Sequence, residues 1–144
     1  MAPSKRDAVA VALRSLARRE HSERGLRERL RRAGFGRDEV DTAIAELVAK
    51  GLLSSERFAA ERARVLAERG RGDAAIRFEL EHENVESESI EAALASLEPE
   101  HERAARLVGR RGAGSATARL LASRGFDEEV VAAAVAHLAR PPVG

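Results

Sequence analysis

The sequence predicts an all-α protein made of three tandem three-helix repeats that form an elongated, curved helical array. The first observation is compositional. The 144 residues include four Phe and no Tyr or Trp, which is too few aromatic residues for a typical sheet-based core. Abundant Ala, Leu, Arg and Glu favour helix instead. The second observation is an internal repeat, which decides how the helices are grouped.

The repeat is a gapless pattern of mostly apolar residues that occurs three times. Its first copy consists of Leu26, Leu30, Gly34, Phe35, Val40, Ala43, Ile44 and Leu47. The second copy has the same spacing and consists of Ile76, Leu80, Asn84, Val85, Ile90, Ala93, Leu94 and Leu97. The third consists of Thr117, Leu121, Gly125, Phe126, Val131, Ala134, Val135 and Leu138. Spacings of three and four place such residues on one helix face, so each copy predicts the same pair of packed helices.

A tight turn is expected between the two helices of each pair. The residue at its centre can adopt the left-handed conformation, and it is Gly34, Asn84 or Gly125. This residue fits position C′ of a Schellman cap, in which the following apolar residue contacts a residue in the last helical turn. That residue is Leu30, Leu80 or Leu121. The three copies therefore encode the same capped helix–turn–helix.

One more amphipathic helix precedes each pair, and the full prediction is nine helices near residues 5–20, 24–33, 37–50, 55–69, 72–83, 87–97, 99–111, 115–124 and 127–139. The predicted N-caps are the serines Ser22, Ser55, Ser87 and Ser115. The repeats are assigned to residues 1–50, 51–97 and 98–140. A short tail follows at 141–144, where two prolines cannot continue a helix. Each repeat is too small for a complete core, so neighbours are expected to pack together.

The net charge of +1 conceals three blocks of opposite sign. Residues 1–37 hold eleven basic residues and four acidic ones, residues 78–102 hold nine glutamates and no Lys or Arg, and residues 103–126 hold six arginines and no acid. Such blocks indicate an oriented surface and a charged partner, although charges also cover ordinary solvated helix faces.

Enzymatic chemistry is not expected. The absence of cysteine excludes disulfides, thiolate nucleophiles and cysteine-bound metals. The four histidines have no metal-ligand spacing, so no metal and no cofactor are predicted. The longest apolar run spans residues 130–136, far short of the roughly 20 residues of a membrane span. No signal peptide is recognised, and a cytoplasmic protein without a membrane partner is expected.

Basic residues are the main candidates for binding. Twenty-three of the 25 basic residues are arginine, whose forked side chain suits phosphate and carboxylate. Some arginines near helix C-termini also compensate the helix dipole. The predicted partner-binding residues are Arg57, Arg64, Arg69, Arg71, Arg77 and Phe78. Arg62 matches Arg103 in the next repeat and is interpreted as structural. For Phe78, packing at a repeat junction is favoured over an exposed apolar contact.

Three segments of the middle repeat carry a resemblance to a known family. They are residues 51–59 (GLLSSERFA), 69–72 (RGRG) and 76–80 (IRFEL). Together with residues 12–19 and 30–35, they resemble the recombination regulator RecX family over almost the whole chain. The resemblance implies tandem three-helix repeats in a cytoplasmic protein that binds the RecA recombinase, lodges in the groove of its nucleoprotein filament and restrains recombination. In that role ATP would be bound by the partner and not by this protein.

Two functions remain open from the residues alone. The first is a monomeric modulator of a protein filament, and the second is a direct DNA-binding protein that uses helix–turn–helix units. The acidic block at 78–102 favours the modulator, because phosphate would repel it. A weak direct contact with DNA stays open in either case.

Overall fold

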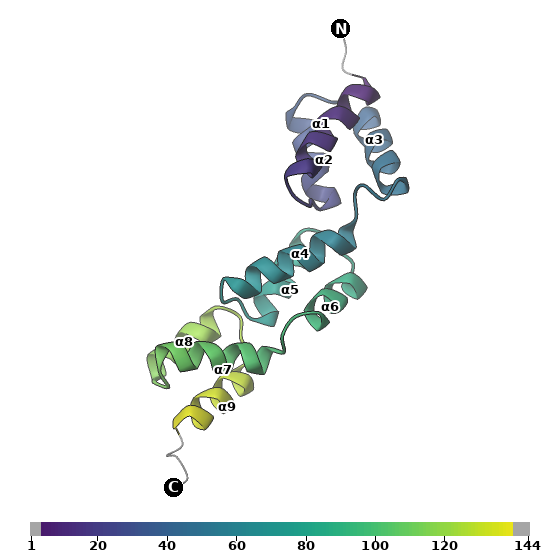
Figure 1. The fold of residues 1–144 in the computed structure, drawn as a ribbon. Helices are drawn as coiled ribbons and strands as arrows, with labels where there is room; N and C mark the ends of the chain where they lie inside the picture. The colour runs from purple at the N-terminus through teal and green to yellow at the C-terminus, as the bar shows by residue number, and fades with distance from the viewer. Residues whose placement is uncertain (1–3, 140–144) are drawn as a thin grey trace.

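The computed structural model describes residues 4–139, in which nine helices and no strand follow one another. Their bounds are α1 Lys5–Arg18, α2 Glu23–Arg32, α3 Arg37–Ala49, α4 Ser55–Glu68, α5 Asp73–His82, α6 Ser87–Ala95, α7 Glu100–Arg111, α8 Ser115–Ser123 and α9 Glu128–Ala139. Three groups of three helices follow one another along the long axis, with the two termini at opposite ends (Figure 1). The predicted elongated all-α array is confirmed. The predicted tail at 141–144 lies outside the described residues.

Each group of three helices encloses its own apolar core. The first core consists of Ala8, Ala12, Leu26, Leu30, Phe35, Val40, Ala43, Ile44, Leu47 and Leu53. The second consists of Phe58, Ala59, Ala63, Leu66, Ile76, Leu80, Val85, Ile90, Ala93 and Leu94. The third is smaller and consists of Ala104, Val108, Leu121, Phe126, Val131 and Ala134. We refer to the groups as units 1, 2 and 3; the residue limits assigned from the sequence, at 50/51 and 97/98, remain predictions.

The turns inside the units are Schellman caps. The residue at C′ has a positive φ in each unit: +96° at Gly34, +59° at Asn84 and +92° at Gly125. The N–H of the next residue donates to the carbonyl of the last-turn leucine, in the pairs Phe35–Leu30 (3.2 Å), Val85–Leu80 (3.1 Å) and Phe126–Leu121 (3.1 Å). These bonds satisfy carbonyls that the helix end leaves free, so the turn prediction is confirmed in every unit.

The N-caps follow the prediction at one of the four serines. Ser22 caps α2, and its hydroxyl accepts a hydrogen bond at 2.9 Å from a backbone N–H in the first turn. Ser54 rather than Ser55 caps α4. Ser87 and Ser115 are the first helical residues of α6 and α8, whose preceding residues make no side-chain cap. The other three predictions failed because the N-cap is the residue with an extended backbone just before the helix. The presence of a serine does not show whether that serine or the residue before it has this conformation.

The second helices of the three units meet end to end. The N-terminus of α5 faces the last turn of α8, where Gly72 N–H donates to the carbonyl of Arg124 (2.9 Å) and Ala74 N–H donates to that of Gly125 (3.2 Å). The backbones approach so closely that a Cβ on Gly72 would overlap Gly125. Units 2 and 3 are therefore joined backbone to backbone.

A buried arginine strengthens the same junction. Arg103 on α7 is 7% exposed and donates to the carbonyls of Arg71 (3.0 Å) and Glu98 (2.8 Å). It also pairs with the Asp73 carboxylate, and its guanidinium lies over the Phe126 ring at 5.9 Å. Because these partners come from units 2 and 3, Arg103 fixes their relative position.

The junction between units 1 and 2 uses the equivalent helix ends but different chemistry. The Ser22 hydroxyl donates to the Glu83 carboxylate (2.5 Å), and the Arg24 guanidinium donates to the carbonyl of His82. Both donors are side chains. Unit 1 is therefore attached through side chains at the position where units 2 and 3 share backbone hydrogen bonds.

Candidate partner-binding surface

The structure brings together three of the six predicted binding residues, Arg69, Arg71 and Phe78, in one open groove. The groove has a volume of about 520 Å³ and lies where the end of α4, the turn after it, α5 and the end of α8 meet. We call it the junction groove. It is lined by Arg62, Leu66, Arg69, Arg71, Ala75, Phe78, Glu79, His82 and Arg124.

The aromatic side chain of the junction groove is exposed. Phe78 is 72% exposed, the largest exposure among the large hydrophobic residues that stand out on the surface. The favoured expectation, packing at a repeat junction, is therefore wrong. The reason is its place on α5: the buried face is formed by Ile76 and Leu80, and a residue two positions from each points away from that face. The Phe78 ring is parallel to that of His82, with the ring centroids 6.5 Å apart and an interplanar angle of 10°.

Three arginines of the junction groove have no ion-pair partner among residues 4–139. They are Arg69, Arg71 and Arg124. Arg124 reaches in from unit 3, since its Nη1 lies 3.0 Å from the position that a Cβ on Gly70 would take. By contrast, the Arg62 guanidinium pairs with Glu79 at 2.6 Å, as expected for a structural arginine. The groove therefore joins three available cations to an exposed aromatic pair.

The other predicted arginines are engaged elsewhere. Arg57 donates to the Glu20 carboxylate (3.1 Å) and to the carbonyl of Gly51 (2.7 Å), so it ties unit 2 to unit 1. Arg77 donates to Glu91 on α6 (2.8 Å), and this hydrogen bond raises the pKa of Arg77 above its ordinary value. Neither lies in the junction groove, and their charges are already balanced.

Arg64 lies outside the junction groove as well. Its guanidinium bonds to Glu61 (2.7 Å) and Glu68 (2.6 Å) on the same helix, and the bond to Glu61 is the main reason that the pKa of Arg64 is raised. The side chain lines a separate groove with Arg103, Arg106 and other residues of α7. The structure therefore separates Arg64 from Arg69 and Arg71, with which it was expected to act.

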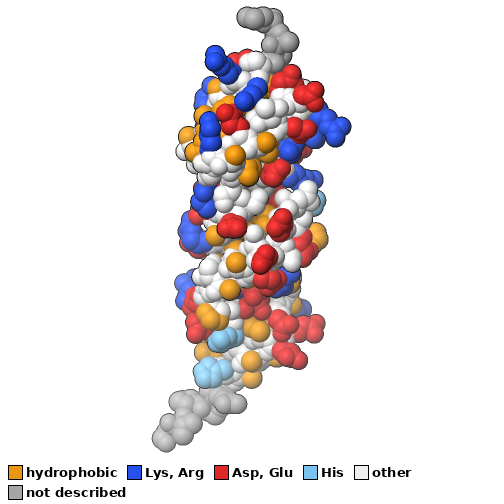
Figure 2. Space-filling model, turned by 90° about the vertical axis from the view of Figure 1, so that its right-hand side faces the viewer, with side chains coloured by type: hydrophobic (Ala, Val, Ile, Leu, Met, Phe, Trp, Pro, Cys, Tyr) orange, Lys and Arg blue, Asp and Glu red, His pale blue; other side chains and the backbone are white. Residues whose placement is uncertain are grey.

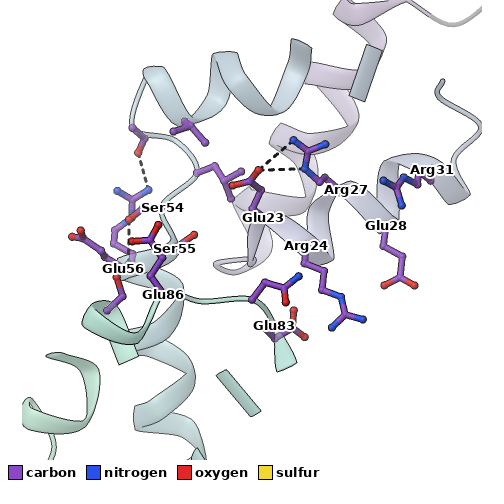
Figure 3. Close-up of a pocket in the computed structure, with 16 residues that line it drawn as sticks. Glu23, Arg24, Arg27, Glu28, Arg31, Ser54, Ser55, Glu56, Glu83 and Glu86 are labelled. Atoms are coloured by element: carbon purple, nitrogen blue, oxygen red, sulfur yellow. Dashed lines mark hydrogen bonds and ion pairs between the residues drawn. The ribbon is translucent and has the colours of Figure 1, made fainter. Parts of the chain in front are cut away.

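A larger groove of about 920 Å³ lies between units 1 and 2. Side chains of α2, the start of α4 and the turn after α5 line it, and both acidic and basic groups are among them (Figure 3). Arg27, for example, bonds to Glu23 (3.3 Å) and to Asp41. Because this groove carries five carboxylates beside four arginines, whereas the junction groove carries four arginines and one carboxylate, it is less suited to an anionic ligand than the junction groove.

Charge is unevenly distributed over the surface. On the face shown in Figure 2, acidic side chains gather over the middle and lower part, and basic ones lie at the N-terminal end and along one edge. Within the described part of the chain, no three His, Asp or Glu side chains form a group that could hold a metal ion. Nor does any described helix combine the length and apolar character that crossing a membrane requires.

Comparison with known proteins identifies the family. Residues 8–47 match the family model described as RecX, first three-helix domain. The regulatory protein RecX of Stenotrophomonas maltophilia is 34% identical over 139 residues, which cover 90% of this chain and 85% of that protein. The chain belongs to the RecX family. The regulatory protein RecX of Syntrophotalea carbinolica is 40% identical over 105 residues, or 72% of this chain and 68% of the relative.

The fold is shared with a RecX protein of known structure. The crystal structure of RecX from Lactobacillus salivarius superposes with a TM-score of 0.78 and covers 93% of this chain and 96% of its own, at 17% identity. The resemblance recognised in the sequence is therefore confirmed, together with the helical-repeat fold. The relatives are named regulatory proteins, which supports a regulatory role for this RecX family member.

Sequence reasoning missed two residues of the junction groove in this RecX family member, Arg124 and His82. The repeat register did contain a signal for Arg124. This residue directly precedes the turn residue Gly125, at the end of a second helix, just as Glu83 precedes Asn84. Using that signal requires the knowledge that the end of each second helix abuts the preceding unit. The repeat pattern does not contain this information.

Proposed function

We propose that this RecX family member binds the RecA recombinase and its nucleoprotein filament on DNA, and that it inhibits ATP hydrolysis and strand exchange by the filament. The observation that carries the proposal is the junction groove, which presents three arginines without ion-pair partners on a fold shared with regulatory RecX proteins. An elongated array suits a filament, because successive units reach successive positions along a repeating partner. In this role the protein acts by binding and hydrolyses nothing itself.

Direct recognition of duplex DNA is less well supported. In a helix–turn–helix protein, the N-terminal residues of the second helix contact the bases of the major groove. The corresponding helices here are α3, α6 and α9. Their first turns contain acidic residues, namely Asp38 and Glu39, Glu88, and Glu128 and Glu129. Carboxylates at these positions would meet the negative potential of the duplex, so all three units are poorly suited to this mode.

The proposal is tested with RecA filaments assembled on single-stranded DNA. The wild-type protein should lower ATP hydrolysis at substoichiometric amounts. The triple substitution Arg69→Gln, Arg71→Gln and Arg124→Gln should raise the half-inhibitory concentration at least about tenfold, since each guanidinium group should contribute about 0.5 kcal/mol or more to binding. Surface positions of this kind change the free energy of unfolding by less than about 0.5 kcal/mol each, so the melting curve should be nearly unchanged.

The matched control removes the same number of charges from unit 1. Arg14, Arg18 and Arg37 are exposed and, like the three groove arginines, lack an ion pair within the described residues. Their replacement by Gln should leave inhibition within about twofold of wild type, given the small effect of isolated surface charges. If the control triple abolishes inhibition and the groove triple does not, the contact lies in unit 1. Unchanged ATP hydrolysis with no association of the wild-type protein would refute the proposed function.

A further inference from the structure

The junction groove combines two features that nucleic-acid-binding surfaces use together. Phe78 and His82 form a parallel, exposed ring pair on α5, and Arg69, Arg71 and Arg124, which line the same groove near the N-terminal end of α5, have no ion-pair partners among residues 4–139. An exposed aromatic ring stacks on any nucleobase, and neighbouring arginines hold the phosphates of the same strand. We propose that the junction groove is a stacking site for single-stranded nucleic acid, in which one unstacked base lies on Phe78.

The occupant is a single strand rather than a duplex. Stacking on Phe78 needs a base that is free of its neighbours, and a base inside a duplex does not offer its face. Acidic residues beside the junction groove also disfavour a duplex, whose two backbones present a wide surface of phosphates. Helix α5 carries Glu79 and Glu81, and the turn after it carries Glu83 and Glu86. A single strand that crosses the groove meets the arginines and avoids the acidic turn, whereas a duplex would approach both.

The groove suits a nucleotide better than an acidic protein segment. A helical ligand is usually bound through several apolar anchors one turn apart, and an extended peptide adds to the edge of a sheet. The junction groove has one exposed large apolar side chain, Phe78, and the described residues contain no strand. The His82 ring, parallel to that of Phe78, adds a second flat ring in the orientation that a stacked base would share.

The site occurs at one junction only within the described array. The repeat places Glu28 at the position of Phe78 and Glu83 at the position of Arg124 in the junction between units 1 and 2. Glu83 is used there to accept the hydrogen bond from Ser22. Both the aromatic ring and one of the cations are therefore replaced by carboxylates, and a strand is expected to be held between units 2 and 3.

This inference deepens the proposed function, because the same groove would meet the DNA strand within the filament. Its test contains no recombinase. Binding of a fluorescein-labelled oligothymidylate is followed by anisotropy with the full chain, beside an oligomer of the same length built from abasic sites. Phe78→Ala should weaken oligothymidylate binding about 5- to 160-fold, the range expected for the loss of one stacked base. It should leave binding of the abasic oligomer unchanged. The control is Leu13→Ala, a 40% exposed side chain in unit 1, which should alter neither.

A second variant reports the stacking directly. The chain contains no Trp and no Tyr, so Phe78→Trp introduces the only indole. This variant should bind oligothymidylate at least as tightly as wild type, and the base should quench its fluorescence, whereas the abasic oligomer should not. Replacing Arg69, Arg71 and Arg124 with Gln should reduce the slope of log K against log salt by about 0.7 for each phosphate contact removed.

The outcomes separate this inference from the proposed function. Equal affinity of wild type and Phe78→Ala, or no quenching of the indole at saturation, would overturn the stacking site. The stacking site would also be overturned if polyglutamate displaced the strand and if the affinity for polyglutamate fell with Phe78→Ala as much as the affinity for the strand. The groove would then be assigned to an acidic protein segment. Inhibition of RecA could persist in both cases. Conversely, strand binding at Phe78 without any effect on RecA would leave the stacking site standing and refute the proposed function.

Discussion

Alanine at Gly125 should lower the free energy of unfolding by about 2–5 kcal/mol, and alanine at Gly34 by only about 1–2 kcal/mol. The two glycines occupy the same position of the same turn, with φ of +92° and +96°. Both substitutions force an L-residue into the left-handed region, which costs about 1–2 kcal/mol. They differ in their neighbours. A Cβ on Gly34 would have nothing within 4 Å, whereas a Cβ on Gly125 would lie 2.6 Å from both Cβ and N of Ala75.

The additional loss at Gly125 arises because the contact includes the backbone of α5. A rotamer change cannot relieve it, so the end of α8 must move away from α5 and stretch the hydrogen bonds from Gly72 and Ala74. Urea denaturation followed by circular dichroism measures both variants. Equal losses for the two alanines would show that units 2 and 3 do not touch through their backbones. Under the proposed function, the Gly125 variant should also be a weaker inhibitor of RecA, since its junction groove would open.

Truncation of Leu80 should lower the free energy of unfolding by about 2–5 kcal/mol. Leu80 is fully buried, and it is the last-turn leucine whose carbonyl accepts the hydrogen bond from Val85. Leu80→Ala removes buried apolar atoms from a unit whose core is formed by ten buried residues, so little can move in to fill the space. The substitution keeps the backbone hydrogen bond, and the loss therefore reports packing alone.

The comparison variants for Leu80 come from the repeat itself. Leu30 and Leu121 are equally buried, at 0% exposure, and their truncation should fall in the same range. Leu13→Ala is the exposed control and should cost less than about 1 kcal/mol. Thermal or urea unfolding monitored by circular dichroism provides the values. A loss below about 0.5 kcal/mol at Leu80, comparable with a surface position, would contradict the register of the repeat.

The helices, their order and the turns within the units were predictable because the interactions that form them are local. Helix hydrogen bonds join residues four apart, and the Schellman bond from Phe35 to Leu30 joins residues five apart. The spacing of Leu26, Leu30 and their counterparts therefore determined which faces are buried. The same register matched Arg62 to Arg103, and both arginines are ion-paired, with Glu79 and Asp73 respectively. The RecX family followed from segments of the middle repeat.

The composition of the junction groove was only half predictable from the sequence, because it depends on contacts between distant residues. Arg57 and Arg77 resembled Arg69 and Arg71 in the sequence, but Glu20 and Glu91, which lie 37 and 14 residues away, pair with them. The placement of Arg124 beside Arg71 depends on how unit 3 meets unit 2.

The sequence alone therefore determined the three-helix units, the Schellman turns inside them and the family, since periodicity and turn residues act over a few positions along the chain. Only the tertiary structure decided which arginines remain available. The stacking of whole units rests on a few close contacts, above all those of Gly72 with Arg124 and Gly125. Such contacts join residues about fifty positions apart, and no periodic pattern encodes them.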